Sequence, residues 1–235
     1  MDIVLVGLEK RKDEEVEEIF GIIEGGIRKS EKFFEIPCFH FKINFLSSRN
    51  ELNQELGRKT PSWLVAHGNS KRTEIAILAP WVFEKESSHL TNSFPKILFH
   101  EIAHLFTSQV YPFLEPLWLI EGLAYFIAEQ KYKVKLISDD LLSCNFLELI
   151  SSYEKWQKMV TKGAYGISYF WVDFLIKSFG KKNLLVLVRK MAVELGKFEN
   201  LFNETYPIRL SLVKEKFITK LRKTKGGGEK NDSRK

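Results

Sequence analysis

The segment His100–His104, which reads His-Glu-Ile-Ala-His, constrains this chain more than any other feature. The residues just before it, Ile97-Leu-Phe99, and those just after it are apolar, so the pattern predicts a largely buried helix. Asn92-Ser93 offers an N-cap for this helix, and Pro95 suits its first turn. Polar side chains in an apolar setting are costly unless they are paired or bind a metal. The fold must therefore give two histidines and a glutamate a partner.

Histidines four residues apart on a helix point the same way, so His100 and His104 can both reach one metal ion. Glu101 lies beside the first histidine and can hold a water bound to that ion. Glu121 can supply a third ligand through a carboxylate oxygen. Three protein ligands plus water is the open coordination of catalytic zinc, not the closed coordination of structural zinc. The alternative interpretation is a pair of core histidines that are hydrogen-bonded to the backbone.

The two segments His100–His104 and Trp118–Phe126 (Trp-Leu-Ile-Glu-Gly-Leu-Ala-Tyr-Phe) resemble the metal motifs of the gluzincin zinc peptidases. The 16 residues between the segments (105–120) fit the small peptidase MA-like domains of that group best. The resemblance implies a zincin-like fold and one Zn²⁺ ion held by His100, His104 and Glu121. It also implies that Glu101 is the general base.

The stretch from Tyr165 to Gly180 is similar to a later helix of the same families, in which a tyrosine precedes a leucine-rich helix. Amide hydrolysis builds an oxyanion, which a phenol can stabilise by a hydrogen bond. Tyr165 is therefore the candidate for this role, and Tyr169, one turn further on, is the rival. The alternative is that Tyr165 is only a half-buried residue at a helix start.

Two departures from the family pattern bear on the activity. Tyr125 stands four residues after Glu121, where thermolysin-like enzymes carry an aspartate that orients a histidine. The Gly-x-Met-Glu-Asn segment with which aminopeptidases of this group read a substrate amino terminus does not occur before residue 100. An endopeptidase is therefore the better prediction. By the resemblance, the strand expected at 74–79 would be the edge that binds an extended substrate by strand addition.

The hydrophobic pattern predicts strands first and helices after them. Residues 13–30 have helical spacing, with Gly25-Gly26 weakening the last turns. Three strands follow, at 39–45, 63–67 and 74–79, with a turn at Gly68-Asn-Ser between the last two. Beyond the two motif helices, four more helices are expected, at 145–159, 165–178, 181–194 and 207–222.

This order predicts an α+β, zincin-like fold: a small N-terminal mixed sheet with the active-site helix, then a mainly helical C-terminal half. We expect one domain over residues 1–222, with an α/β part at 1–115 and a helical part at 116–222.

The positive charge of the chain is concentrated at its end. Residues 214–235 hold nine Lys or Arg and three acids, and this difference of six equals the formal net charge of the whole chain, +6. The body is therefore neutral on balance, and nucleic acid is not an expected partner for it. Residues 223–235 contain no apolar side chain, so a disordered basic tail is expected there.

The remaining features predict a cytoplasmic protein. The N-terminus does not resemble a signal peptide, and no apolar run reaches the ~18 residues that a membrane helix needs, so membrane insertion is not expected. Cys38 and Cys144 do not make a disulfide framework, and they are interpreted as core residues. His40, His67 and His89 are expected to have no catalytic role.

The function predicted from these features is zinc-dependent hydrolysis of peptide bonds, most simply by an endopeptidase acting on a peptide or protein substrate. Glu101 would be the general base, and Tyr165 and zinc would share the oxyanion. One alternative is a non-hydrolytic zinc-binding interaction module whose basic tail makes the contact. Another is a metallohydrolase that acts on a non-peptide amide or ester.

Overall fold

The computed structural model describes residues 3–194 and 198–227. Strands come first and helices after them, so the predicted mixed α+β architecture is confirmed. The chain forms two compact units. The first contains residues 1–109 and 127–129, and the second contains residues 110–126 and 130–235.

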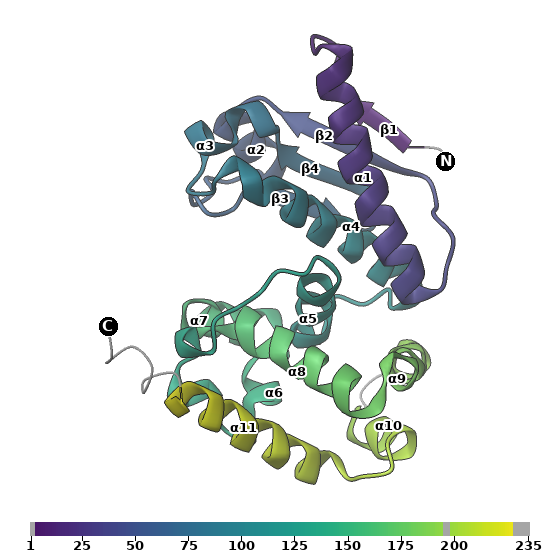
Figure 1. Cartoon of the computed structure of the whole chain (residues 1–235), viewed down its shortest axis with the longest axis vertical. Helices are drawn as coiled ribbons and strands as arrows, with labels where there is room; N and C mark the ends of the chain where they lie inside the picture. Colours follow the sequence, from purple (N-terminus) through teal and green to yellow (C-terminus); the bar gives the residue numbers. More distant parts are fainter. Residues whose placement is uncertain (1–2, 195–197, 228–235) are drawn as a thin grey trace. The chain divides into compact units, whose positions relative to one another are not determined.

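The first unit contains a four-stranded mixed sheet in the order β1-β2-β4-β3 (Figure 1). β2 pairs in parallel with both β1 and β4, whereas β3 pairs antiparallel with β4. The strands are β1 (Ile3–Val6), β2 (Phe41–Leu46), β3 (Ala66–Asn69) and β4 (Glu74–Leu78). β3 is thus an edge strand and β4 an inner one.

The expectation that residues 74–79 form the substrate-binding edge is therefore wrong. Residues 75–79 are all buried apolar side chains, so β4 is covered on both faces in addition to being paired on both edges. The strand expected at 63–67 is observed three residues later, and it includes Gly68 and Asn69. The turn of the hairpin accordingly falls at 70–73, where the side-chain oxygen of Asn69 accepts from Arg72 N at 3.2 Å. Strand β1 was not expected from the sequence.

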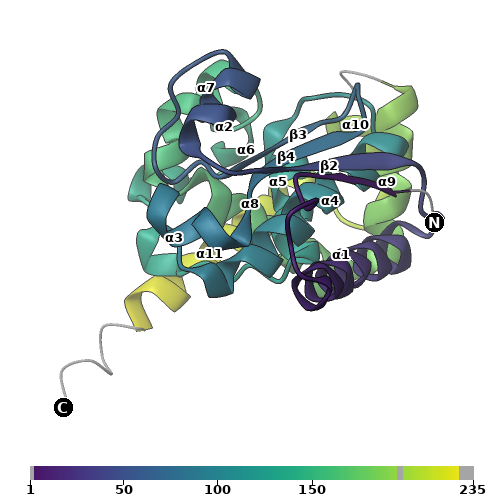
Figure 2. The same ribbon diagram turned by 90° about the horizontal axis from the view of Figure 1, so that it is seen from above.

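Helices α1 (Asp13–Phe34) and α4 (Phe94–Val110) lie on the same face of this sheet (Figures 1 and 2). α1 runs through Gly25-Gly26 without interruption, contrary to the expected weakening. A Cβ atom on Gly26 would stand 2.8 Å from both Phe99 Cδ1 and Ile102 Cδ1. The glycines are therefore the means by which α1 and α4 approach closely, and that contact compensates for their low helix propensity. The shorter helices of this unit are α2 (Arg49–Leu56) and α3 (Phe83–Glu86).

The second unit is helical in the part that the structure describes. The helix predicted at 145–159 is two short helices, and α10 was not expected. The helices are α5 (Leu117–Ile127), α6 (Phe146–Leu149), α7 (Tyr153–Met159), α8 (Ala164–Phe179), α9 (Lys181–Val193), α10 (Phe198–Thr205) and α11 (Leu210–Gly227). Their core is aromatic: the fully buried ring of Trp171 on α8 lies 5.0 Å from that of Phe217 and 5.4 Å from that of Phe146. None of the described helices combines the length and the apolar character needed to cross a membrane.

Helix α11 changes the interpretation of the basic tail. It continues to Gly227, so the expected disorder is wrong for residues 223–227, and residues 228–235 lie outside the described part of the chain. Lys225 Nζ donates to Ile137 O and to Asp139 Oδ1, at 2.8 Å each. These polar contacts anchor the last turns of the helix although they contain no apolar side chain.

Candidate metal centre

Helix α4 carries both histidines of the sequence motif. As predicted, it begins in the segment Asn92–Pro95, where Ser93 Oγ donates to Leu90 O. His100 and Glu101 are buried, with 9% and 8% of their surface exposed, and His104 is half-buried. The Nε2 atoms of the two histidines are 2.9 Å apart, and the imidazole rings are nearly perpendicular, at 89°. The predicted convergence of the two imidazoles is therefore present.

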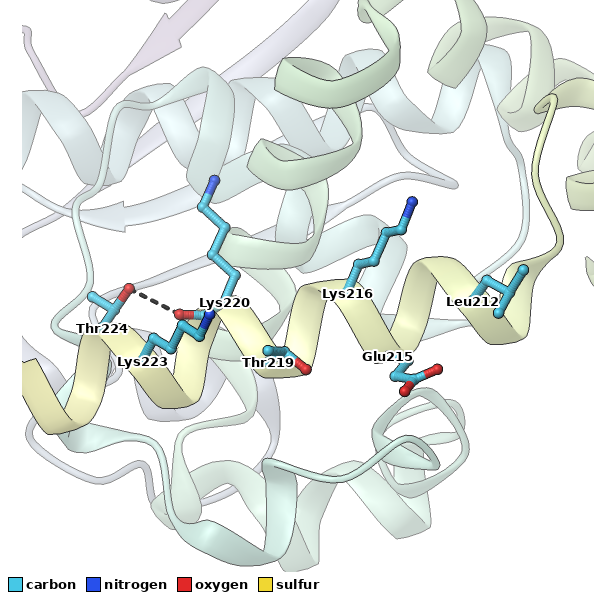
Figure 3. Close-up of a pocket in the computed structure, with 7 residues that line it drawn as sticks. All are labelled: Leu212, Glu215, Lys216, Thr219, Lys220, Lys223 and Thr224. Carbon is cyan, nitrogen blue, oxygen red and sulfur yellow. Dashed lines mark hydrogen bonds between the residues drawn. The ribbon is translucent and has the colours of Figure 1, made fainter.

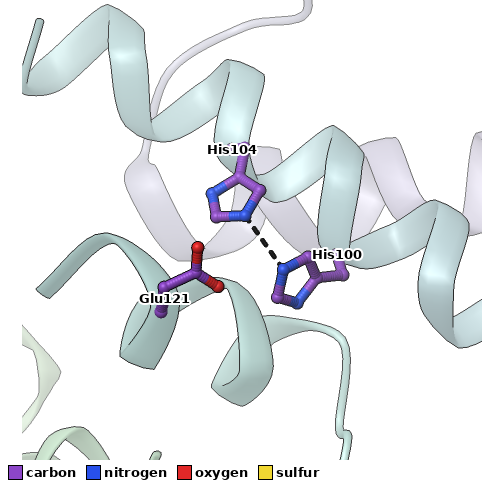
Figure 4. A group of neighbouring side chains, drawn as sticks. All are labelled: His100, His104 and Glu121. Carbon is purple, nitrogen blue, oxygen red and sulfur yellow. Dashed lines mark hydrogen bonds between the residues drawn. The ribbon is translucent and has the colours of Figure 1, made fainter. Parts of the chain in front are cut away.

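His100, His104 and Glu121 each offer one ligand atom, and these three atoms all lie within 4.8 Å of one another. Figure 4 shows the carboxylate of Glu121 beside the two imidazoles. This group could hold a metal ion. The residues brought together are the three that the sequence singled out.

Gly122, the residue after Glu121, determines how closely α5 packs within its own unit. A Cβ atom on Gly122 would stand 2.6 Å from Ser168 O and 2.7 Å from Val172 Cγ2, both on α8. Only a glycine lets α5 pack this closely against α8. In the Glu-Gly pair of the motif, Glu121 is therefore the candidate ligand and Gly122 makes the packing contact with α8.

The donor set fits a divalent metal. Two imidazole nitrogens and one carboxylate oxygen suit Zn²⁺ and neighbouring transition metals, whereas Ca²⁺ and Mg²⁺ prefer oxygen ligands alone. Three protein donors leave at least one coordination position for water or substrate. A catalytic metal site needs such an open position, whereas a structural zinc site is closed by four protein ligands.

Glu101 lies against the edge strand β3. A Cβ atom on Gly68 would stand 3.2 Å from Glu101 Oε2 and 3.9 Å from His104 Cβ. The glycine thus allows the backbone of β3 to lie beside the carboxylate, and a large side chain at this position would displace it. The sequence interpretation placed Gly68 in a turn and missed this role. The available signal was a glycine within a strand, which often marks a close approach of another group.

The pairing of β3 with β4 shows which backbone groups of β3 face outward. Val65 O accepts from Leu78 N at 2.9 Å, in register with the antiparallel pairs that follow. Because such pairing alternates, residues 65, 67 and 69 direct their N–H and C=O groups toward β4. Those of Ala66 and Gly68 point to the open edge. The outward-facing backbone at Gly68 and the carboxylate of Glu101 are therefore neighbours.

Tyr165 stands at the start of α8 and is half-buried. Its ring centroid lies 5.4 Å from that of Tyr125 and 5.1 Å from that of Trp156. Tyr125 is one helical turn after Glu121 on α5, so within its own unit Tyr165 packs near the face of α5 that carries this ligand. Tyr169 instead packs on Phe170, and burial, together with Asp173, raises the pKa of its phenol. The role of Tyr165 stays a prediction.

The other histidines make different contacts. His89 Nε2 lies 2.8 Å from Trp63 O, within hydrogen-bond distance. His67 alternates with Gly68 along β3, so its side chain is on the sheet face opposite to Glu101. His40 is exposed just before β2. None of these three histidines belongs to the group of candidate ligands found among the described residues.

A separate hollow of about 710 Å³ lies along α11 and shares no lining residue with the candidate metal centre. Lys216, Lys220 and Lys223 follow one face of the helix at intervals of four and three residues (Figure 3). The remaining lining residues are Leu212, Glu215, Thr219 and Thr224. The hollow is therefore a shallow basic surface without the ligands or nucleophiles of an active site.

Comparisons with known proteins add no family to this description: no family model, no curated protein and no solved structure matches the chain.

Proposed function

We propose that this protein is a zinc-dependent peptidase of the gluzincin type, with endopeptidase action as the simplest form. The observation that carries the proposal is the convergence of His100, His104 and Glu121 within 4.8 Å, with the buried Glu101 next to the first histidine. When bound there, zinc would polarise the scissile carbonyl and lower the pKa of the attacking water.

Glu101 is the general base in this proposal. Its carboxylate takes a proton from the attacking water and passes it to the leaving nitrogen, as peptide hydrolysis requires. A purely structural metal site has no use for such a base. The burial of Glu101 and its position beside the edge strand both support this role.

The substrate peptide lies along β3, not along β4. An extended peptide can add to an exposed sheet edge through main-chain hydrogen bonds, and β3 offers the outward-facing groups of Ala66 and Gly68 for this purpose. Gly68 lies against Glu101, so a peptide held there has its backbone close to the base. Tyr165 is the proposed donor of a hydrogen bond to the developing oxyanion.

The test is Glu101→Gln, measured by cleavage of a diverse peptide library and by metal content. Glutamine keeps the shape of the side chain but cannot accept the proton, so we expect a loss on the order of a hundredfold or more in cleavage rate. Metal content should be unchanged. Glu24→Gln, at an exposed glutamate paired with Arg28 on α1, is the control and should cleave normally. Cleavage by Glu101→Gln at the wild-type rate would show that Glu101 is not the base.

A second candidate function is a non-hydrolytic zinc module that binds a polyanion through α11. The basic hollow favours it, because lysines on one helix face can neutralise successive phosphates. Binding of a single-stranded oligonucleotide that weakens steeply with salt, together with no cleavage of peptides, would favour this candidate. The triple variant Lys216→Ala/Lys220→Ala/Lys223→Ala should then abolish binding. Including amides and esters in the library tests the third possibility, a metallohydrolase of non-peptide substrates.

A further inference from the structure

We infer that Trp63 is an anchoring site for an apolar side chain of the peptide substrate, several residues away from the scissile bond. This inference rests on the proposed peptidase function, and it concerns a part of the first unit that neither the metal nor Glu101 explains. Three features carry it: the exposure of Trp63, the way its loop is held, and the continuity of that loop with β3.

Trp63 is unusually exposed for its type. It is 49% exposed, whereas Trp118, Trp156 and Trp171 are 3% exposed or less and Trp81 is half-buried. Large aromatic side chains at such exposure are frequent where a protein binds a partner, because they offer much contact area for few rotatable bonds. Exposure alone does not define a binding site, because the backbone must also hold the side chain in place.

The backbone that presents Trp63 is held at four successive carbonyl groups. Arg49 Nη1 donates to Pro61 O at 3.2 Å and also to Leu64 O, and Arg49 Nη2 donates to Ser62 O at 3.1 Å. The carbonyl of Trp63 itself lies 2.8 Å from His89 Nε2. A loop fixed in this way presents an exposed indole that loses little conformational entropy on binding.

A second loop lies beside the first and also exposes an apolar side chain. Ser88 N donates to Ser62 O at 3.2 Å, so residues 87–90 run next to residues 61–64. Leu90, in this second loop, is 63% exposed. The two neighbouring loops thus expose one aromatic and one aliphatic side chain, which suits an apolar group more than a charged one.

The loop leads directly into β3, and this continuity identifies the occupant as the substrate peptide. Pairing with β4 already begins at Val65, two residues after Trp63. Trp63 precedes Gly68 by five residues, so at about 3.3 Å per residue the two are separated by at most ~16 Å. A peptide on the open edge of β3, with its scissile bond near Gly68 and Glu101, therefore reaches Trp63 with a side chain about four to six residues from that bond.

The experiment uses a peptide that the protein cleaves and places Phe or Ser, one position at a time, four to six residues on either side of the scissile bond. We expect Phe at one position to raise kcat/KM about tenfold over Ser. Whether the position that prefers Phe precedes or follows the scissile bond gives the direction in which the peptide runs along β3. Trp63→Ala should remove this preference, so that its kcat/KM is the same for the Phe peptide and the matching Ser peptide, whereas Trp63→Phe should keep part of the preference.

Trp81→Phe, at a half-buried tryptophan that contacts Arg11, is the matched control and should keep the full preference. The inference is overturned if no position prefers Phe, or if Trp63→Ala retains the preference. A protein that cleaves no peptide refutes the proposed function instead. Trp63 is then judged by tryptophan fluorescence alone. Phe-containing peptides of the library must protect the fluorescence of wild type, but not that of Trp63→Phe, from quenching by acrylamide. Equal protection of the two proteins overturns the inference.

Discussion

The contact between α1 and α4 can be tested with two glycines of the same helix. Gly21 and Gly26 both lie inside α1, but their surroundings differ. A Cβ atom on Gly21 meets nothing within 4 Å, whereas one on Gly26 stands 2.8 Å from atoms of Phe99 and Ile102. Replacing glycine by alanine within a helix gains roughly 0.5–1 kcal/mol from helix propensity. We therefore expect Gly21→Ala to stabilise the protein by about that amount.

At Gly26 the same gain is opposed by a clash. Carbon atoms pack best at about 3.5–4.0 Å, so the new methyl group would overlap its neighbours by roughly 1 Å. Ile102 is fully buried and cannot move freely, and inserting a methyl group into a packed core typically costs about 1–3 kcal/mol. After the propensity gain, Gly26→Ala should be destabilising by up to about 2 kcal/mol.

The assay is urea unfolding of the two single variants beside the wild type, followed by circular dichroism. The difference between the variants should be about 1–3 kcal/mol, since the propensity gain is common to both. Phe99 and Ile102 flank His100 and Glu101, so Gly26→Ala should also weaken metal binding while Gly21→Ala does not. Equal stabilisation by both alanines would refute the close packing of α1 on α4.

Three further predictions concern other parts of the chain. Tyr165→Phe should lower kcat by ~10²–10³ with little change in KM or metal content, because the bond forms mainly in the transition state. Tyr169→Phe is its control, and a larger defect there would reverse the choice of tyrosine. Deleting residues 228–235 should leave the melting temperature unchanged, whereas deleting 224–235 removes the contacts of Lys225 and should lower it by roughly 2–4 °C, for a loss of about 1 kcal/mol. Equal melting temperatures would show that these contacts contribute nothing. Burial, together with Glu115, raises the pKa of Tyr111 to about 12, so its contribution to stability is complete below pH ~10 and is lost as the pH rises toward 12. Alkaline unfolding that is identical in Tyr111→Phe would contradict this.

The sequence predicted the local features of the site well. Two histidines at helical spacing in an apolar segment indicated a buried helix that directs both imidazoles to one point, and their Nε2 atoms are 2.9 Å apart. The inclusion of Glu121 came from the motif around it, and the structure brings it to the same group. These inferences depend on helix geometry and on a short motif, which the sequence contains directly.

Features that depend on distant neighbours could not be predicted in the same way. Strand order is set by pairing between segments far apart in the chain, so the edge was assigned to 74–79 although β3 occupies it. Gly26 and Gly68 look like weak points or turn residues until Phe99 and Glu101 are placed beside them. The last turns of α11 depend on Lys225 reaching Ile137 and Asp139, and their composition alone suggested disorder.

The metal content of the protein tests the central claim most directly. Elemental analysis of protein purified without added metal should find one zinc ion per chain, retained in Glu101→Gln. The double variant His100→Ala/His104→Ala should hold none, because it removes two of the three ligand atoms that lie within 4.8 Å of one another. A wild-type protein with no more zinc than this double variant would contradict the account.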